Sequence, residues 1–308
     1  MERVAGAWCD GDAVCFRLPD QDQELAAVRL MCGFLGSPEF KYLPEHRRWE
    51  LRLPRPEAAR IEYKLELTHR DGRRETICDQ GNPRRAPGGY GDSSVLWCRD
   101  YREPDWLHLP PVAGDWHDLG PLTRAWSPSG SAGRVEPFHV VLLAPEDRFE
   151  AYSASSAYTR MLTTKLLPRL FPQLGAKAPV IGAGASLGAL GMLYTQRAAP
   201  GLFAGLFLQS GSYFQPRFDS QESGFARYQR ITRFVAQVLR APDGPAVPAT
   251  LTCGVVEENL ANNRDMAATL RRQGYEVTFV ENRDAHNWIG WRDTLDPHLT
   301  TLLQRVWP

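Results

Sequence analysis

The stretch that determines the fold reads Val180-Ile181-Gly182-Ala183-Gly184-Ala185-Ser186-Leu187-Gly188-Ala189-Leu190-Gly191-Met192-Leu193-Tyr194. A short apolar run opens it, and small or apolar residues recur at helical spacing from Leu187 onward. This pattern predicts a strand, a sharp turn at Ser186 and a helix, the context in which the motif Gly-x-Ser-x-Gly indicates a nucleophilic serine. Gly184 and Gly188 would let backbone segments approach closely, and the Leu187 N–H would face a developing oxyanion.

A second apolar run supports this interpretation. This run, residues 201–208, is followed by Gln209-Ser210-Gly211-Ser212. It predicts the next parallel strand, reached through the helix. The five-residue motif alone is equally well explained by a glycine-rich turn that only packs closely. The βαβ unit around Ser186 favours the nucleophile.

Composition limits the classes of function. The chain has 308 residues, of which 43% are hydrophobic, so it can form two domains with a sizeable core. The formal net charge is +0 at pH 7, so neither nucleic acid nor an anionic membrane is an expected partner. No run approaches the roughly 20 apolar residues that a membrane span needs. The oligomeric state stays open.

The cysteines bear on metal binding and on the cellular compartment. All six are scattered without a C-x-x-C pair, so no zinc site is expected. Most lie in the first third of the chain, where a disulfide remains an alternative to free thiols. The first residues show no signal-peptide pattern, which favours buried free thiols and a soluble, cytoplasmic protein.

Three regions differ in their pattern. Residues 1–104 contain short β-prone runs, of which 61–67 alternates most clearly and precedes the hairpin signal Asp71-Gly72, so they predict a β-sandwich. Residues 105–136 are rich in Pro, Gly, Trp and Asp and are interpreted as a linker and entry segment. Residues 137–308 alternate strands with helices, which predicts an α/β fold with a parallel sheet covered by helices.

The order of three residue types indicates a catalytic triad. In an α/β-hydrolase the serine is followed by Asp or Glu and then by His. Glu257 and Glu258 follow one late predicted strand, and His286 follows the next. Each has an ordinary alternative, such as a surface-loop histidine or acidic residues at a helix N-terminus. Together they favour Ser186 as nucleophile, His286 as general base and acid, and a glutamate that orients the imidazole.

At these residues the sequence resembles the enterochelin (ferric enterobactin) esterases. The similar segments are 184–188, 209–212, 254–257 and 284–292, with Trp49, 62–64, 82–83 and 94–96 in the first domain. The resemblance implies an α/β-hydrolase preceded by an all-β, immunoglobulin-like sandwich. It implies a cytoplasmic enzyme that hydrolyses the trilactone of a catecholate siderophore, releases iron and needs no cofactor and no metal. It also selects Glu257 over Glu258 as the acid beside Ser186 and His286.

The sequence departs from this family between its domains. Relatives carry extra strands and a His-Asp-Gly loop there, whereas 105–136 is short and 116–120 is at best a remnant. One sheet edge and one oxyanion donor are therefore in question. A feruloyl or acetyl carbohydrate esterase and a non-catalytic binding protein of the same fold are the alternatives.

Candidate substrate-binding residues are Arg148, Trp288 and Arg292. Cations and aromatic faces suit a ferric catecholate, which is anionic and aromatic. A solvated surface arginine is the alternative for Arg148, and we expect Trp291 to pack beneath the last helix.

Overall fold

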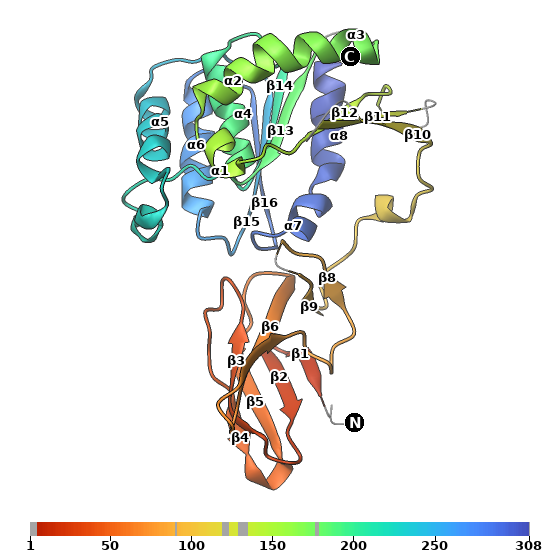
Figure 1. The fold of residues 1–308 in the computed structure, drawn as a ribbon, viewed down its shortest axis with the longest axis vertical. Helices are drawn as coiled ribbons and strands as arrows, with labels where there is room; N and C mark the ends of the chain where they lie inside the picture. The colour runs from red at the N-terminus through yellow and green to blue at the C-terminus, as the bar shows by residue number, and fades with distance from the viewer. Residues whose placement is uncertain (1–4, 90, 119–122, 129–134, 176–178, 308) are drawn as a thin grey trace. The chain divides into compact units, whose positions relative to one another are not determined.

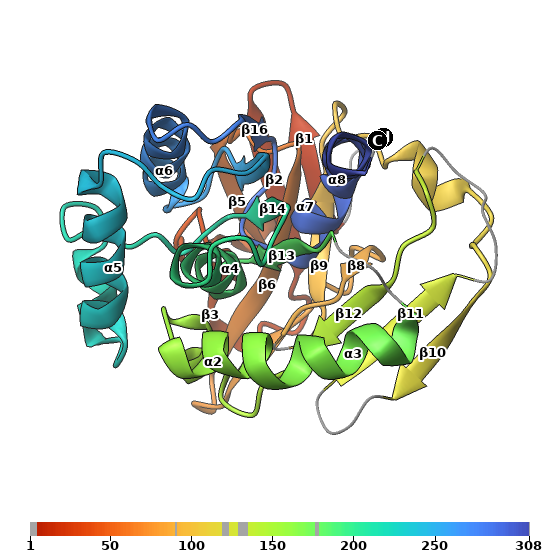
Figure 2. The ribbon, with the colours of Figure 1, turned by 90° about the horizontal axis from the view of Figure 1, so that it is seen from above.

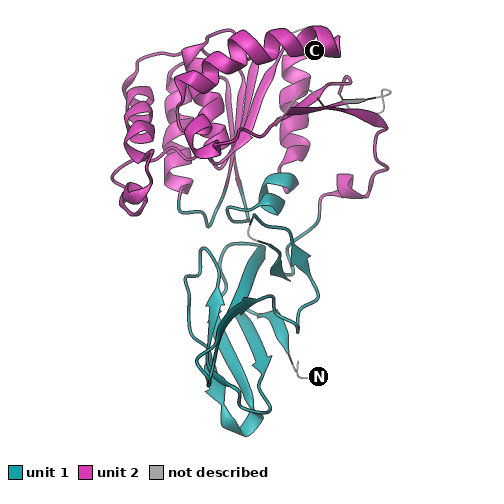
Figure 3. Cartoon of the chain, in the orientation of Figure 1, with its two compact units in different colours: residues 1–103, 254–258, 282–292 teal, residues 104–253, 259–281, 293–308 magenta. Residues whose placement is uncertain are grey.

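The computed structural model describes two compact units. The described residues are 5–89, 91–118, 123–128, 135–175 and 179–307. The first unit comprises 1–103, 254–258 and 282–292, and the second comprises 104–253, 259–281 and 293–308 (Figure 3). None of the helices in these described stretches has the length and apolar character required to cross a membrane.

An antiparallel sandwich forms most of the first unit (Figure 1). One sheet has the order β1-β2-β5-β4, and the other has the order β3-β6-β9-β8 with β7 paired to β6. The elements are β1 (Gly6–Asp10), β2 (Ala13–Pro19), β3 (Leu25–Met31), β4 (Lys41–Leu43), η1 (Pro44–His46), β5 (Arg48–Pro54), β6 (Arg60–His69), β7 (Arg74–Ile77), β8 (Arg85–Ala86) and β9 (Ser93–Trp97).

Strand β6 shows why this sequence forms a sandwich. Its apolar side chains at alternate positions, Ile61, Tyr63, Leu65 and Leu67, are buried in the core between the sheets. The strand then pairs with β7 through the turn at Gly72, where φ is 87°. The predicted β-sandwich and its Asp-Gly hairpin are therefore confirmed.

A parallel sheet of order β13-β14-β15-β16 is the centre of the second unit. The strands are β13 (Ile181–Ala185), β14 (Gly205–Gln209), β15 (Ala249–Gly254) and β16 (Val277–Asn282). β14 is parallel to both β13 and β15. All of β14 is buried, as expected for a parallel strand covered on both faces.

Helices cover both faces of this sheet. Figure 2 shows α4 and α6 on one side and α8 on the other. Helix α4 packs on β13 and β14, and α8 packs on β14. The helical elements that follow β12 in the chain are α1 (Arg148–Tyr152), α2 (Ser156–Met161), the π-helical turn η3 (Leu162–Leu166), α3 (Leu167–Leu174), α4 (Leu187–Ala198), η4 (Ser220–Gly224), α5 (Tyr228–Arg240), α6 (Leu260–Arg272), α7 (Trp288–Asp293) and α8 (Leu295–Val306). The predicted α/β class is confirmed.

The segment 105–136 contains ordered elements that the sequence does not reveal. It holds the turn η2 (Asp105–His108) and the strands β10 (Gly114–Asp118) and β11 (Thr123–Pro128), which form an antiparallel sheet with β12 (Val140–Leu143). Most of β10 is exposed, so no buried face imposes an apolar alternation on its sequence. Residues 119–120 of the remnant at 116–120 lie outside the described residues.

Candidate active site

Ser186 occupies a strained turn between β13 and α4. Its backbone has φ 57° and ψ −124°, a region that non-glycine residues rarely adopt. Two hydrogen bonds hold this conformation, because Ser186 N donates to Gln209 O over 2.8 Å and Ser212 N donates to Ser186 O over 3.2 Å. The turn has the geometry of a nucleophile elbow, in which the serine stands at the end of a strand.

Close backbone approach requires glycine at one of the two flanking positions. A Cβ on Gly184 would lie 2.5 Å from the carbonyl carbon of Gly188, which is backbone and cannot move aside. A Cβ on Gly188 would meet nothing within 4 Å. The expectation that both glycines are needed for close approach therefore holds at Gly184 and is wrong at Gly188.

The segment after β14 lies beside the serine. Ser212 Oγ is 3.2 Å from Ser186 Oγ, and the segment is fastened to the start of α6 by two buried asparagines. Asn259 Nδ2 donates to Ser210 O over 3.0 Å, and Asn263 accepts from Gly211 N over 2.9 Å. The sequence does not identify these asparagines as supports, since a polar residue on a helix more often faces solvent.

The start of α4 supplies a backbone donor. Leu187 is the first residue of the helix, and its side chain is buried. The N–H groups of a first helical turn have no partner within the helix and carry the positive end of the helix dipole. Leu187 N–H can therefore serve an anionic oxygen.

His286 and Glu257 form a hydrogen-bonded pair in the first unit. His286 Nδ1 lies 2.8 Å from Glu257 Oε2, and the Glu257 side chain is only 1% exposed. The other carboxylate oxygen, Oε1, accepts from Gly254 N over 2.8 Å. Glu258 is exposed. In a neutral imidazole, a carboxylate at Nδ1 favours the tautomer with the proton on that nitrogen, which leaves a lone pair on Nε2.

Aromatic rings line the other side of His286. The Trp291 ring meets the imidazole edge-on at 5.0 Å between centroids and meets Trp288 at 5.2 Å. Trp288 is 58% exposed. Trp291 thus makes edge-on ring contacts with both residues, and its packing beneath the last helix stays a prediction. Arg292, on the same helix α7, is half-buried.

Arg148 lies in the second unit at the start of α1. It is exposed, with its guanidinium over the neighbouring Phe149 ring at 5.4 Å. The predicted site residues thus divide between the units. His286, Glu257, Trp288 and Arg292 belong to the first, and Ser186, Leu187 and Arg148 belong to the second.

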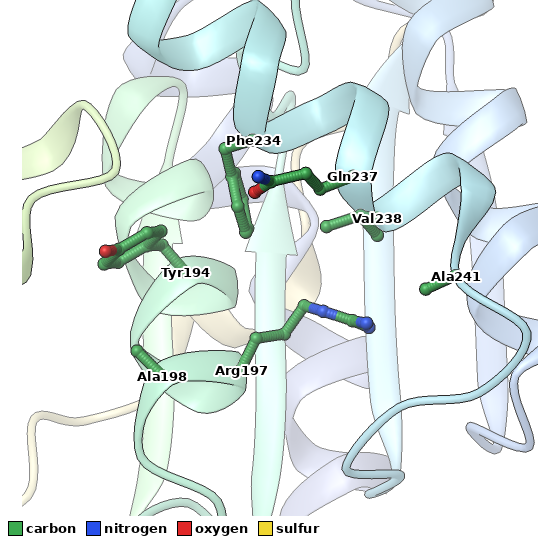
Figure 4. Close-up of a pocket in the computed structure, with 7 residues that line it drawn as sticks. All are labelled: Tyr194, Arg197, Ala198, Phe234, Gln237, Val238 and Ala241. Atoms are coloured by element: carbon green, nitrogen blue, oxygen red, sulfur yellow. The ribbon is translucent and has the colours of Figure 1, made fainter.

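A pocket of about 340 Å³ lies between α4 and α5, lined by Tyr194, Arg197, Phe234 and Gln237 among others (Figure 4). These lining residues of α4 belong to its last turns. A helix rises about 1.5 Å per residue, so they lie roughly 12 to 18 Å along the axis from Ser186. This pocket is therefore separate from the elbow.

The six cysteines are free thiols, four of them buried. Within the ranges that the structure describes, His, Cys, Asp and Glu side chains do not gather in groups of three or more that could hold a metal ion.

The fold and the elbow define an α/β-hydrolase with an additional β-sandwich. A family model described as "Putative esterase" matches residues 105–302, more than half of the chain, and the chain belongs to this esterase family. The protein is therefore a carboxylic ester hydrolase.

Solved structures share this architecture along the whole chain. An enterobactin esterase from Shigella flexneri, in the presence of 2,3-dihydroxy-N-benzoyl-serine, aligns with a TM-score of 0.75 and 17% identity over 100% of this chain and 98% of that chain. A ferric enterobactin esterase from Salmonella typhimurium aligns with a TM-score of 0.72 and 17% identity over 99% of this chain and 97% of that chain. These likenesses confirm the fold that the resemblance implied. No curated protein matches the chain by sequence.

The contrast between the two elbow glycines can be tested directly. Gly184→Ala should destabilise the protein by about 1–3 kcal/mol or more, because the added methyl group overlaps the Gly188 backbone. Gly188→Ala, in the first turn of α4, should stay within about 0.5 kcal/mol of the parent. Denaturant unfolding of the two purified variants measures both values. Equal midpoints would contradict the steric account.

Proposed function

We propose that this esterase is a serine hydrolase in which Ser186 attacks the ester carbonyl and His286, held by Glu257, transfers the proton. One observation carries the proposal: the His286 imidazole is hydrogen-bonded through Nδ1 to the Glu257 carboxylate, which is almost fully buried. A histidine in an ordinary surface loop is not expected to pair with a buried carboxylate, because burying that charge costs free energy. The strained backbone of Ser186 supports the same conclusion independently, since strain of this kind is typical of functional sites.

The topology of the sheet supports a shared site. Ser186 follows β13, Glu257 follows β15 and His286 follows β16. Parallel strands deliver the residues that follow them to the same edge of a sheet, where ligands of α/β proteins bind.

The chemistry would proceed through an acyl-enzyme. As Ser186 Oγ bonds to the carbonyl carbon, its proton passes to His286 Nε2, and Glu257 stabilises the resulting imidazolium. The carbonyl oxygen becomes an anion and accepts from Leu187 N–H. The imidazolium then returns the proton to the leaving alcohol as the ester C–O bond breaks. Water repeats the sequence, releasing the acid and restoring Ser186.

The proposed substrate is the trilactone of a catecholate siderophore. The similar structures include enterobactin esterases crystallised with enterobactin and with dihydroxybenzoyl ligands. In this chain, the exposed Trp288 offers a ring face, and Arg148 and Arg292 offer cations. Hydrolysis would release the bound iron from this small-molecule partner. Free thiols are in keeping with a cytoplasmic enzyme, the compartment we propose.

Loss of the nucleophile or of the base should abolish activity. Ser186→Ala and His286→Ala should each slow hydrolysis of a short p-nitrophenyl ester by at least about 10³-fold, because neither residue can be replaced by the other. His298→Ala is the matched control, since this half-buried histidine on α8 follows the same late strand. A Ser186→Ala protein that retains most of its activity, with a fluorophosphonate label on another residue, would show that the nucleophile lies elsewhere.

Adjacent glutamates allow a paired test of the acid. Glu257→Gln should lower kcat by about 10²–10⁴-fold, because the amide no longer enforces the Nδ1-protonated tautomer. Glu258→Gln should have little effect, since Glu258 is exposed. Steady-state kinetics on the same ester compares the two variants. Small and equal effects would indicate a Ser-His dyad that works without an acid.

Substrate preference is tested by side-by-side kinetics. The kcat/KM should be higher for a catecholate trilactone than for acetyl or feruloyl sugar esters, because ring and charge contacts strengthen its binding in the transition state. Faster turnover of the sugar esters would identify a carbohydrate esterase instead. Inertness toward all three, with Ser186 unlabelled by fluorophosphonate, would contradict the catalytic proposal itself.

A further inference from the structure

Arg60 is a buried cation at the start of β6. It is 1% exposed, and it lies on the opposite face of the strand from the apolar positions that fill the sandwich core. Glu62, two residues along on the same face, accepts from Arg60 Nη1 over 2.8 Å. A buried guanidinium needs such partners, because desolvation of an unpaired charge is very costly.

The remaining hydrogen bonds of Arg60 go to the segment that carries His286. Its Nε donates to Asp284 Oδ2 over 3.0 Å, and its Nη2 donates to Asn287 Oδ1 over 2.6 Å. Asp284 and Asn287 are two residues before and one residue after the histidine. The guanidinium thus spans the backbone segment from which the imidazole projects.

The two bracketing side chains also determine the local backbone. Asp284 Oδ1 accepts from its neighbour Ala285 N and from Asn287 Nδ2, each over 2.8 Å. Asn287 Oδ1 accepts from Gly290 N over 2.8 Å in the first turn of α7. Loss of the guanidinium would therefore disturb both sides of His286 together.

The electrostatics make this arrangement sensitive to the loss of the cation. Burial raises the pKa of the Asp284 carboxyl, and the positive charge of Arg60 opposes that shift. Burial likewise raises the pKa of Glu62, again against the effect of Arg60. Without the cation, the buried Asp284 and the partly buried Glu62 would lose a favourable charge interaction and would rearrange or take up protons.

We infer that Arg60 is a positioning residue for the reaction, which holds the imidazole of His286 in the orientation that accepts the serine proton. This inference rests on the proposed function. It gives the sandwich strand β6 a part in catalysis through its contact with Asp284 and Asn287. Arg60 itself need not touch the substrate.

The test compares two buried arginines of the sandwich. Arg60→Lys keeps a positive charge but loses the planar fork that reaches Asp284 and Asn287 at once. Arg17→Lys is the matched control, because Arg17 is also buried and pairs with Glu50 over 2.7 Å. For each variant we would measure kcat and KM on a p-nitrophenyl ester and the midpoint of thermal unfolding. The proton resonance of the imidazole N–H that faces Glu257 would be recorded by NMR.

The expected result is a selective loss of turnover. In Arg60→Lys, kcat should fall on the order of tenfold to a hundredfold with KM nearly unchanged, as expected for a misplaced catalytic group. Its imidazole N–H resonance should shift or broaden. Arg17→Lys should keep both kcat and the resonance even where its unfolding midpoint falls as far. Where Arg60→Lys does not fold, Asn287→Ala replaces it with the same expectation.

Two outcomes would overturn the positioning role. One is an unchanged kcat in Arg60→Lys, and the other is an equal loss in Arg60→Lys and Arg17→Lys. The proposed function fails separately, through the activity of Ser186→Ala or His286→Ala. Inactive Ser186 and His286 variants beside a fully active Arg60→Lys would reject the role of Arg60 alone.

Discussion

A serine held at a positive φ angle is the constraint on which the second unit depends. Such a backbone costs on the order of 1–3 kcal/mol and persists only where its surroundings enforce it. The surroundings are β13 and β14, whose register sets Ala185 opposite Gln209 and so brings the Gln209 carbonyl to the Ser186 N–H. Close passage of Gly184 against the first turn of α4 completes the enforcement. The sheet register, the start of the helix and the backbone conformation of Ser186 therefore depend on one another.

Much of this arrangement can be predicted from the sequence because it is local. The strand, the turn at Ser186 and the helix follow one another directly between Ile181 and Ala198, so apolar spacing and glycines reveal them. The positions of Glu257 and His286 after late strands can be predicted from the sequence for the same reason. Strand β10 cannot be predicted in this way, since it is mostly exposed and its sequence shows no apolar alternation.

Other parts of the site depend on contacts that sequence spacing cannot show. Which of Glu257 and Glu258 faces the histidine depends on the direction of each side chain in the turn after the strand, where successive side chains point different ways. Only the folded chain shows Glu257 turned to the imidazole. Asn259 and Asn263 resemble ordinary polar helix residues until their amides are seen to hold the backbone after β14. Arg60 begins an ordinary-looking strand, and its partners Asp284 and Asn287 lie more than 200 residues away in the sequence.

The first unit is assembled from three separate stretches of chain, and this has a consequence for biosynthesis. Asp284 follows Arg60 by 224 positions. At about 5–20 residues per second, a ribosome delivers the carboxylate roughly 10 to 45 s after the guanidinium. During that interval the nascent sandwich cannot bury Arg60 beside Asp284, so this end of β6 stays hydrated. Completion of the first unit therefore waits until residues 282–292 have been translated, so folding of residues 1–103 alone cannot finish it.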